Sequence, residues 1–229
     1  MSQLSIWQRI LAYLETGTQL VRQSFKPRPP TDTVAFSISF IALAAKLAKA
    51  DGTVTRNEVT MFRRVFDIPP EEEANAARVF NLCRQDTTGY KTYAKQLSKA
   101  LAKTPAGDTL REDVLDGLFH IAMADGVYHP AEDFFLKQVT EVFGLGEGVF
   151  LRLRARHVPE LRDPYSILGV SADVSLEDLR LARKQFVRNN HPDQLIAKGL
   201  PREMIELANA RLASFNDAYD EIAKIIGQD

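Results

Sequence analysis

The sequence offers little from which a disulfide-bonded, strongly charged or membrane-spanning protein is built. Its one cysteine, Cys83, excludes an internal disulfide and a cysteine-rich zinc site, and we expect it to be a small buried residue. The 29 Lys and Arg residues nearly balance the 30 Asp and Glu residues, so no global field would draw the chain to nucleic acid or to anionic membranes. The longest apolar stretch, Val34 to Ala50, is interrupted by Lys46 and Lys49 and falls short of the ~20 residues of a membrane span. We therefore expect a soluble, cytoplasmic protein without a transmembrane segment.

Patterns of catalytic residues are also missing. Nothing resembles a phosphate-binding loop or a dinucleotide fingerprint, and His120, His129 and His157 lack the neighbours of a metal site or of a nucleophile's base. A basic patch before Val158 has no interleaved aromatic residues, so we interpret it as a solvated helix face and not as a nucleic-acid site. This patch consists of Arg152, Arg154, Arg156 and His157. No catalytic constellation is visible, so we expect a protein that is not an enzyme.

Two gaps that contain prolines, at 26–31 and 158–164, divide the chain. The arm before the first gap contains Trp7 and reads as an amphipathic helix. Its few cations favour packing on a neighbouring helix, or self-association, over a membrane surface. The predicted parts are an N-terminal arm (1–25), a helical bundle (33–150), a linker (151–162) and a C-terminal unit (163–229).

The fold class predicted for the whole chain is all-α, a helical bundle followed by a helical hairpin. Apolar residues of the bundle recur at three- and four-residue spacing, and glycines and prolines separate the periodic segments. These segments lie near 33–50, 56–67, 70–84, 88–103, 109–124, 130–143 and 147–156. No segment shows a convincing strand pattern.

A short pattern occurs twice within the bundle. AKADGTVTRNEV around Asp51 reappears as AMADGVYHPAED around Asp125, and a glutamate, Glu58 or Glu132, follows each Asp-Gly pair. An ordinary EF-hand is excluded because its first two ligand positions would hold Leu and Lys in one copy and Ile and Met in the other. Helix capping explains the residues well, with glycine C-caps and Pro130 at a helix start. The alternative is a divalent cation site shared by the carboxylates.

The doubled A-x-A-D-G…E pattern, in an all-helical module of this length, resembles the TerB (tellurite-resistance) domain over residues 33–150. This resemblance implies metal binding through acidic residues. The positions that match are Asp51, Glu58, Asp125 and Glu132. No other cofactor is expected.

The C-terminal unit contains three motifs in series. From Asp163 the chain reads DPYSILGV, then a predicted helix over 175–190, the tripeptide His191-Pro192-Asp193, and a predicted helix over 201–226. Both helices carry an apolar stripe at three- and four-residue steps, so we expect an antiparallel hairpin. Pro192 disfavours helix at His191, which places the tripeptide at the tip of the hairpin. A cationic row on the first helix points toward this tip and consists of Arg180, Lys184 and Arg188.

These motifs, with Phe215-Asn216-Asp217-Ala218-Tyr219 in the last helix, resemble the J domain in order and spacing. The stretch HPDQLIAKGLPREMIELANARLASFNDAYDEI looks like the DjlA branch, which joins a TerB-like domain to a C-terminal J domain. The resemblance implies a co-chaperone that stimulates the ATPase of a DnaK-type chaperone. In such a complex the nucleotide-binding domain and linker of the chaperone contact His191, Pro192 and Asp193. Its acidic surface pairs with Arg180, Lys184 and Arg188, while the bundle recruits an unknown client.

The sequence departs from this family at several points. DjlA proteins usually begin with a transmembrane segment, which the N-terminal arm does not provide. Gln194 replaces a frequent lysine, and Asn189 and Asn190 replace the usual basic and aromatic pair before the tripeptide. Two alternatives therefore stay open: a metal-responsive binding module that the hairpin tethers to the chaperone, and an adaptor with a degenerate J domain.

Overall fold

The structure of the 229-residue chain is a computed structural model. It describes residues 5, 7–8, 10–12, 34–50, 60, 68, 70–84, 89–102, 107–190 and 205–227. Within these residues every regular element is a helix, which confirms the predicted all-α class. Of the predicted helix at 56–67 only residue 60 is described, and the tripeptide 191–193 lies outside the described residues.

The bundle is formed by helices whose ends follow the glycines and prolines of the sequence. Gly144, for example, ends α7 with a positive φ of 68°, a backbone conformation that glycine adopts without strain. The helices are α2 (Val34–Leu47), α4 (Glu73–Arg84), α5 (Tyr90–Leu101), α6 (Gly107–Ala122), α7 (Pro130–Phe143) and α8 (Glu147–His157). Short 3-10 turns, η2 (Pro70–Glu72) and η3 (Met123–Asp125), lie before α4 and after α6.

Helix α2 is the central helix of the bundle and contacts α4, α5, α6 and α7. The side chains from Ser39 to Ala48 are all buried, so this part of the longest apolar stretch is core and not surface. Even Lys46 is buried, and its ammonium lies 5.6 Å from the centre of the Tyr93 ring. None of the described helices is long and apolar enough to cross a membrane.

The described part of the N-terminal arm packs into the same core. Trp7, Ile10 and Leu11 are buried among the bundle residues, and Ser5 and Gln8 exchange hydrogen bonds in a reciprocal cap. These three apolar side chains are therefore covered within the chain and are not offered to lipid or to a second copy. The expectation that the arm packs on a neighbouring helix is confirmed for these residues.

The C-terminal unit begins after the 3-10 turn η4 (Pro159–Leu161). Its helices are α9 (Pro164–Leu168), α10 (Leu176–Asn190) and α12 (Ile205–Ile226). The DPYSILG motif forms α9: the Asp163 carboxylate accepts hydrogen bonds from the backbone N–H groups of Tyr165 and Ser166, and Gly169 ends the helix with a φ of 69°. The Ser166 hydroxyl, which also donates to this carboxylate, and then the two backbone bonds hold the pKa of Asp163 below its usual range.

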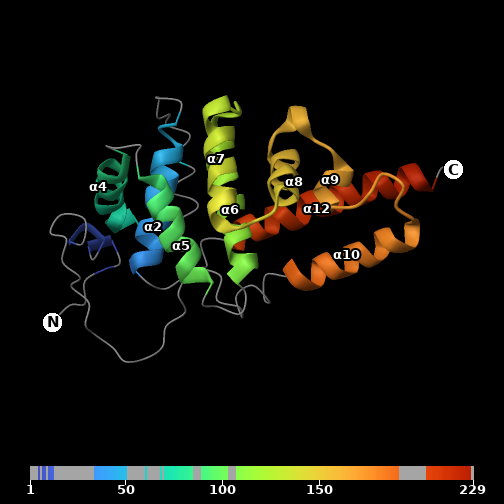
Figure 1. The fold of residues 1–229 in the computed structure, drawn as a ribbon, viewed down its shortest axis with the longest axis horizontal. Helices are drawn as coiled ribbons and strands as arrows, with labels where there is room; N and C mark the ends of the chain where they lie inside the picture. The colour runs from blue at the N-terminus through green and yellow to red at the C-terminus, as the bar shows by residue number, and fades with distance from the viewer. Residues whose placement is uncertain are drawn as a thin grey trace.

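Helix α8 connects the bundle to the C-terminal unit. Phe150 and Leu153 belong to the apolar core of the bundle, whereas Ala155 belongs to the smaller core of α9, α10 and α12. Helix α9 contacts both α8 and α12, and α12 runs from beside α6 to the far end of the molecule (Figure 1). The segment 151–162, expected to be a linker, is therefore mostly packed helix.

Candidate functional site

The cationic row lies on the solvent side of α10. Arg180, Lys184 and Arg188 are all exposed, while Leu179 on the opposite side is fully buried. Ser175 caps the start of the helix, and its hydroxyl oxygen accepts the Asp178 N–H at 3.1 Å. The structure thus brings the three predicted cations onto one accessible face, at the helix that leads to the tripeptide.

Apolar and aromatic contacts hold α10 against α12. The rings of Phe186 and Phe215 stack with their centres 3.7 Å apart and their planes 7° from parallel. The Arg183 guanidinium lies over the Tyr219 ring at 4.6 Å, so this arginine belongs to the hairpin contact and not to the free row. Ala218 and Ile222 complete the buried stripe of α12. The packing of the two predicted helices is confirmed.

Helix α10 ends at Asn190, directly before the tripeptide, as predicted. The side chain of Asn190 uses both its donor and its acceptor. It donates to the backbone carbonyl of Phe186 at 2.9 Å and accepts from Arg211 Nη1 at 3.1 Å. Asn190 replaces an aromatic residue of the J family, and in this structure that replacement gives Arg211 of α12 a polar partner.

The basic patch of α8 is not the solvated face that the sequence predicted. Its members form ion pairs with acidic residues of α6 and α7: Arg152 with Glu112 at 2.7 Å, Arg154 with Asp133 at 3.2 Å, and both Arg156 and His157 with Asp116, at 3.0 and 2.8 Å. The Arg156 side chain is only 4% exposed. The interpretation was wrong because the acidic partners are distant in sequence and meet α8 only in the folded bundle.

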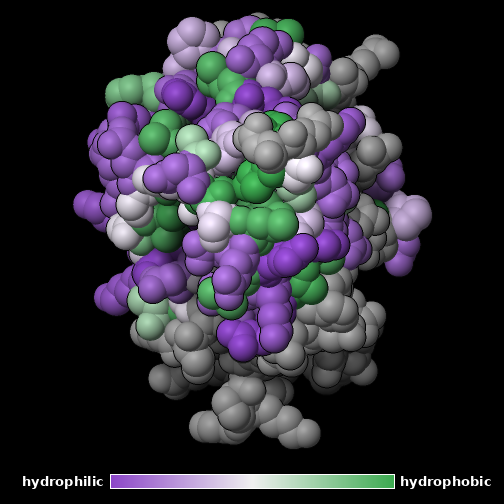
Figure 2. All heavy atoms as spheres, turned by 90° about the vertical axis from the view of Figure 1, so that its right-hand side faces the viewer, coloured by the Kyte–Doolittle hydropathy of each residue, from purple (hydrophilic) through white to green (hydrophobic). Residues whose placement is uncertain are grey.

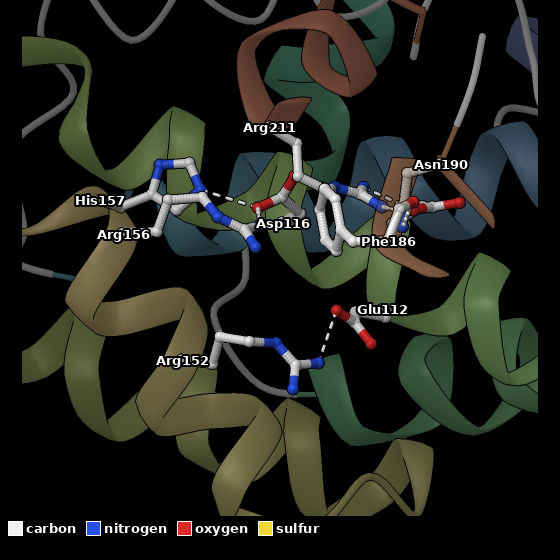
Figure 3. A network of polar contacts seen from close by, with 9 residues as sticks. Glu112, Asp116, Arg152, Arg156, His157, Phe186, Asn190 and Arg211 are labelled. Carbon is white, nitrogen blue, oxygen red and sulfur yellow. Dashed lines mark hydrogen bonds and ion pairs between the residues drawn. The ribbon is translucent and has the colours of Figure 1, made fainter. Parts of the chain in front are cut away.

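A junction network joins the bundle to the hairpin, and we define it as Asp113, Asp116, Arg156, His157 and Arg211. Figure 3 labels four of these residues, Asp116, Arg156, His157 and Arg211. Arg211 pairs with Asp113 and donates from Nε to Asp116 Oδ2 at 3.2 Å. Asp116 therefore receives cations from α8 and from α12 at once. The two carboxylates of the network balance its two guanidinium groups.

The two aspartates of the junction network differ in their pKa. Burial raises the pKa of Asp113 to about 6, although Arg211 acts in the opposite direction. Burial would also raise the pKa of Asp116, but Arg211, Arg156 and His157 outweigh it and hold that pKa well below its usual range. Asp116 is therefore the firmly ionised centre of the network, whereas burial disfavours the ionised form of Asp113.

Sequence reasoning missed this network, although α12 carries one signal for it. The buried stripe of α12 runs through Ala208, Arg211, Phe215 and Ala218, so an arginine occupies a core position of a regular three-four pattern. Such an arginine must find a buried acid or leave a charge without a partner. The partner itself, Asp116, is 95 residues away in sequence and has no pattern that singles it out.

The repeated acidic motif acts as a helix cap in its second copy. Gly126 follows η3 with a φ of 84°, and Asp125 Oδ1 accepts the Val127 N–H at 2.9 Å. Glu132 is buried, and its carboxylate accepts the His129 N–H at 2.9 Å in a capping box at the start of α7. Asp51 and Glu58 of the first copy lie outside the described residues. The described residues contain no cluster of three or more metal-ligating side chains.

The surface at the hairpin end of the molecule is mainly hydrophilic, with a smaller apolar patch near its middle (Figure 2). Two large apolar side chains of the C-terminal unit, Leu181 and Ile225, are exposed, and so is Leu161 of the preceding turn η4. Leu181 lies on α10 next to Arg180. The accessible face of α10 therefore combines positive charge with one apolar side chain.

Comparison with known proteins agrees with both units. Residues 37–155 match the family described as Tellurite resistance protein TerB, which is about half of the chain. This chain belongs to the TerB family. Its TerB region includes α8 up to Ala155, the residue that enters the hairpin core.

This TerB-family chain is also similar to several proteins named Co-chaperone protein DjlA. That of Aliivibrio fischeri is 27% identical, covering 80% of this chain and 76% of its own, and that of Pasteurella multocida is 26% identical, covering 93% and 86%. A 93% cover necessarily includes most of the C-terminal unit, so the likeness extends beyond the TerB match. The DjlA-like character predicted from the sequence is confirmed. No solved structure matches the chain.

Proposed function

We propose that this chain is a co-chaperone whose hairpin docks on a DnaK-type chaperone and stimulates its ATP hydrolysis, while the TerB-family bundle recruits a client. One observation carries the proposal. An exposed cationic row leads along α10 to His191-Pro192-Asp193, in a chain that resembles proteins named DjlA across both units. We place its action in the cytoplasm, where such a chaperone and its ATP are available.

The mechanism follows from charge and geometry. Arg180, Lys184 and Arg188 attract an acidic surface and orient α10 on it, which brings the tripeptide beside the chaperone's nucleotide-binding domain and linker. The docked state must bind the hydrolysis-competent form of the chaperone better than its resting form, because only differential affinity shifts such an equilibrium. The groups that hydrolyse ATP belong to the chaperone, so this chain is a regulator.

The first test is single-turnover ATP hydrolysis by a DnaK-type chaperone with the full chain. We expect stimulation by the wild type and none by His191→Gln or Asp193→Asn, provided that circular dichroism shows both variants folded. If the wild type does not stimulate, the proposed function is rejected. The bundle would then carry the function, either as an adaptor or as a cation-binding module.

The second test removes the charge of the row. Changing Arg180, Lys184 and Arg188 together to Gln should raise the concentration of this chain that gives half-maximal ATPase stimulation, on the order of tenfold or more. The same concentration for the wild type should itself rise with salt. A matched control makes the same change at three exposed lysines of other helices, Lys91, Lys137 and Lys224. Equal losses in both triple variants would show that only net charge matters, and the row would lose its assigned role.

A further inference from the structure

One continuous set of polar contacts links the bundle to the last residue of α10. The Arg211 guanidinium, 3% exposed, donates to Asn190 at the end of α10 and to Asp116 of α6 (Figure 3). Asn190 in turn donates to the carbonyl of Phe186, one turn earlier in α10. A single planar donor group therefore connects α6, α10 and α12.

The junction network is better suited to fixing geometry than to adding stability. Removing four charged groups from water opposes much of their mutual attraction, so a buried ion network adds little net stability. Among the described residues, two nitrogens of Arg156, Nε and Nη2, have no hydrogen-bond partner, which lowers the net gain further. The directional fork of Arg211 instead fixes how α10 and α12 lie against α6.

We propose that Asp116 and Arg211 are positioning residues that act through Asn190. They hold the last turn of α10 in a set direction relative to the bundle, and so orient the cationic row for its partner. This inference rests on the proposed function and names the groups that regulate the same surface. Asn190, which replaces an aromatic residue of the J motif, then links α10 to the junction network through Arg211.

The physical coupling is tested first, without any chaperone. Hydrogen exchange in the last turn of α10, residues 187–190, is measured in Asn190→Ala and Asp116→Asn. We expect exchange there on the order of threefold to tenfold faster in both variants, with α7 unchanged, because each change removes a contact of the same chain of bonds. The matched control is Asn75→Ala, which removes a hydrogen bond to Glu72 at the other end of the bundle. If Asp116→Asn does not fold, Asp113→Asn replaces it.

The functional consequence is tested in the ATPase assay. Asn190→Ala should raise the concentration of this chain that gives half-maximal ATPase stimulation about threefold to tenfold and leave the maximal rate of hydrolysis unchanged. The reason is that a smaller fraction of the molecules then has α10 in the binding orientation, which lowers the apparent affinity alone. The effects of Asn190→Ala and Asp116→Asn should be strongly non-additive in the double variant, because both interrupt one path. Full additivity, or normal exchange in α10 of the Asp116 variant, would overturn the proposal. If the wild type fails to stimulate, the proposed function falls, and the exchange experiment still decides whether the junction positions α10.

Discussion

The core of the bundle and the junction network are both buried, but they are built from different chemistry. Leu115, Leu118 and Phe119 of α6 are fully buried in an apolar core, whereas Asp113 and Asp116 of the same helix face charged partners. Apolar packing is non-directional and proportional to area, so it makes the bundle compact without specifying one partner for each side chain. Charged hydrogen bonds are directional, and so the junction specifies how the hairpin lies on the bundle.

Among the variants that test this difference, Arg211→Met should have the largest effect on the free energy of unfolding. The change leaves Asp113 and Asp116 with too few cations, and losing one partner of a buried ion pair costs about 3–5 kcal/mol of unfolding free energy. Urea unfolding followed by circular dichroism measures the loss.

Two further variants give unfolding free energies with which the loss from Arg211→Met can be compared. Leu118→Ala in the apolar core should cost about 2–5 kcal/mol through lost burial and a cavity. Arg162→Met breaks the pair with Glu221 at 2.7 Å, whose side chains are 40% and 43% exposed, and should cost about 0–1 kcal/mol. A loss from Arg211→Met no larger than that from Arg162→Met would show that the junction network does not hold the two units together.

An intermediate effect is expected from Asp113→Asn and its dependence on pH. The folded-state pKa of about 6 lies above the ordinary value of 3.8, so the folded protein binds more protons than the unfolded chain between these values. Asp113 therefore adds stability as the pH falls through 6, and this contribution is lost again as the pH rises. From pH 7 to pH 5 the wild type should gain about 1 kcal/mol relative to Asp113→Asn.

Denaturant unfolding of both proteins at the two pH values gives the difference directly. Asp116 behaves in the opposite way, because its lowered pKa contributes stability that is lost only in stronger acid. If the difference in unfolding free energy between wild type and Asp113→Asn stays constant over this range, burial does not raise the pKa of Asp113.

The smallest effect is expected from Asp125→Ala. The change removes one capping hydrogen bond to the Val127 N–H and should cost about 0.5–1 kcal/mol, equally with and without added calcium or zinc. Thermal unfolding in each condition measures the cost, and calorimetry of Asp51→Ala with Asp125→Ala checks for binding heat. A loss that appears only with metal present would favour the cation site over the cap.

The sequence predicted most helices because its local signals agreed with the tertiary fold. Helix α7 runs from Pro130 to Phe143, as the proline start and the glycine stop predict. Helix α9 was not predicted, although Asp163 before Pro164 and the later Gly169 are a helix start and stop. Five residues are too few to show a periodic apolar stripe, which is the signal on which the other predictions relied.

The all-α class, the hairpin of α10 and α12, and the exposure of the cationic row could all be predicted from the sequence. Each of these depends on contacts between near neighbours or on periodicity along one helix. The burial of Arg156 and the contact of Asp116 with Arg211 could not be predicted, because such pairings depend on which helix faces come together in the folded chain. The sequence shows which residues carry a charge, but packing between distant segments decides whether that charge is solvated or paired.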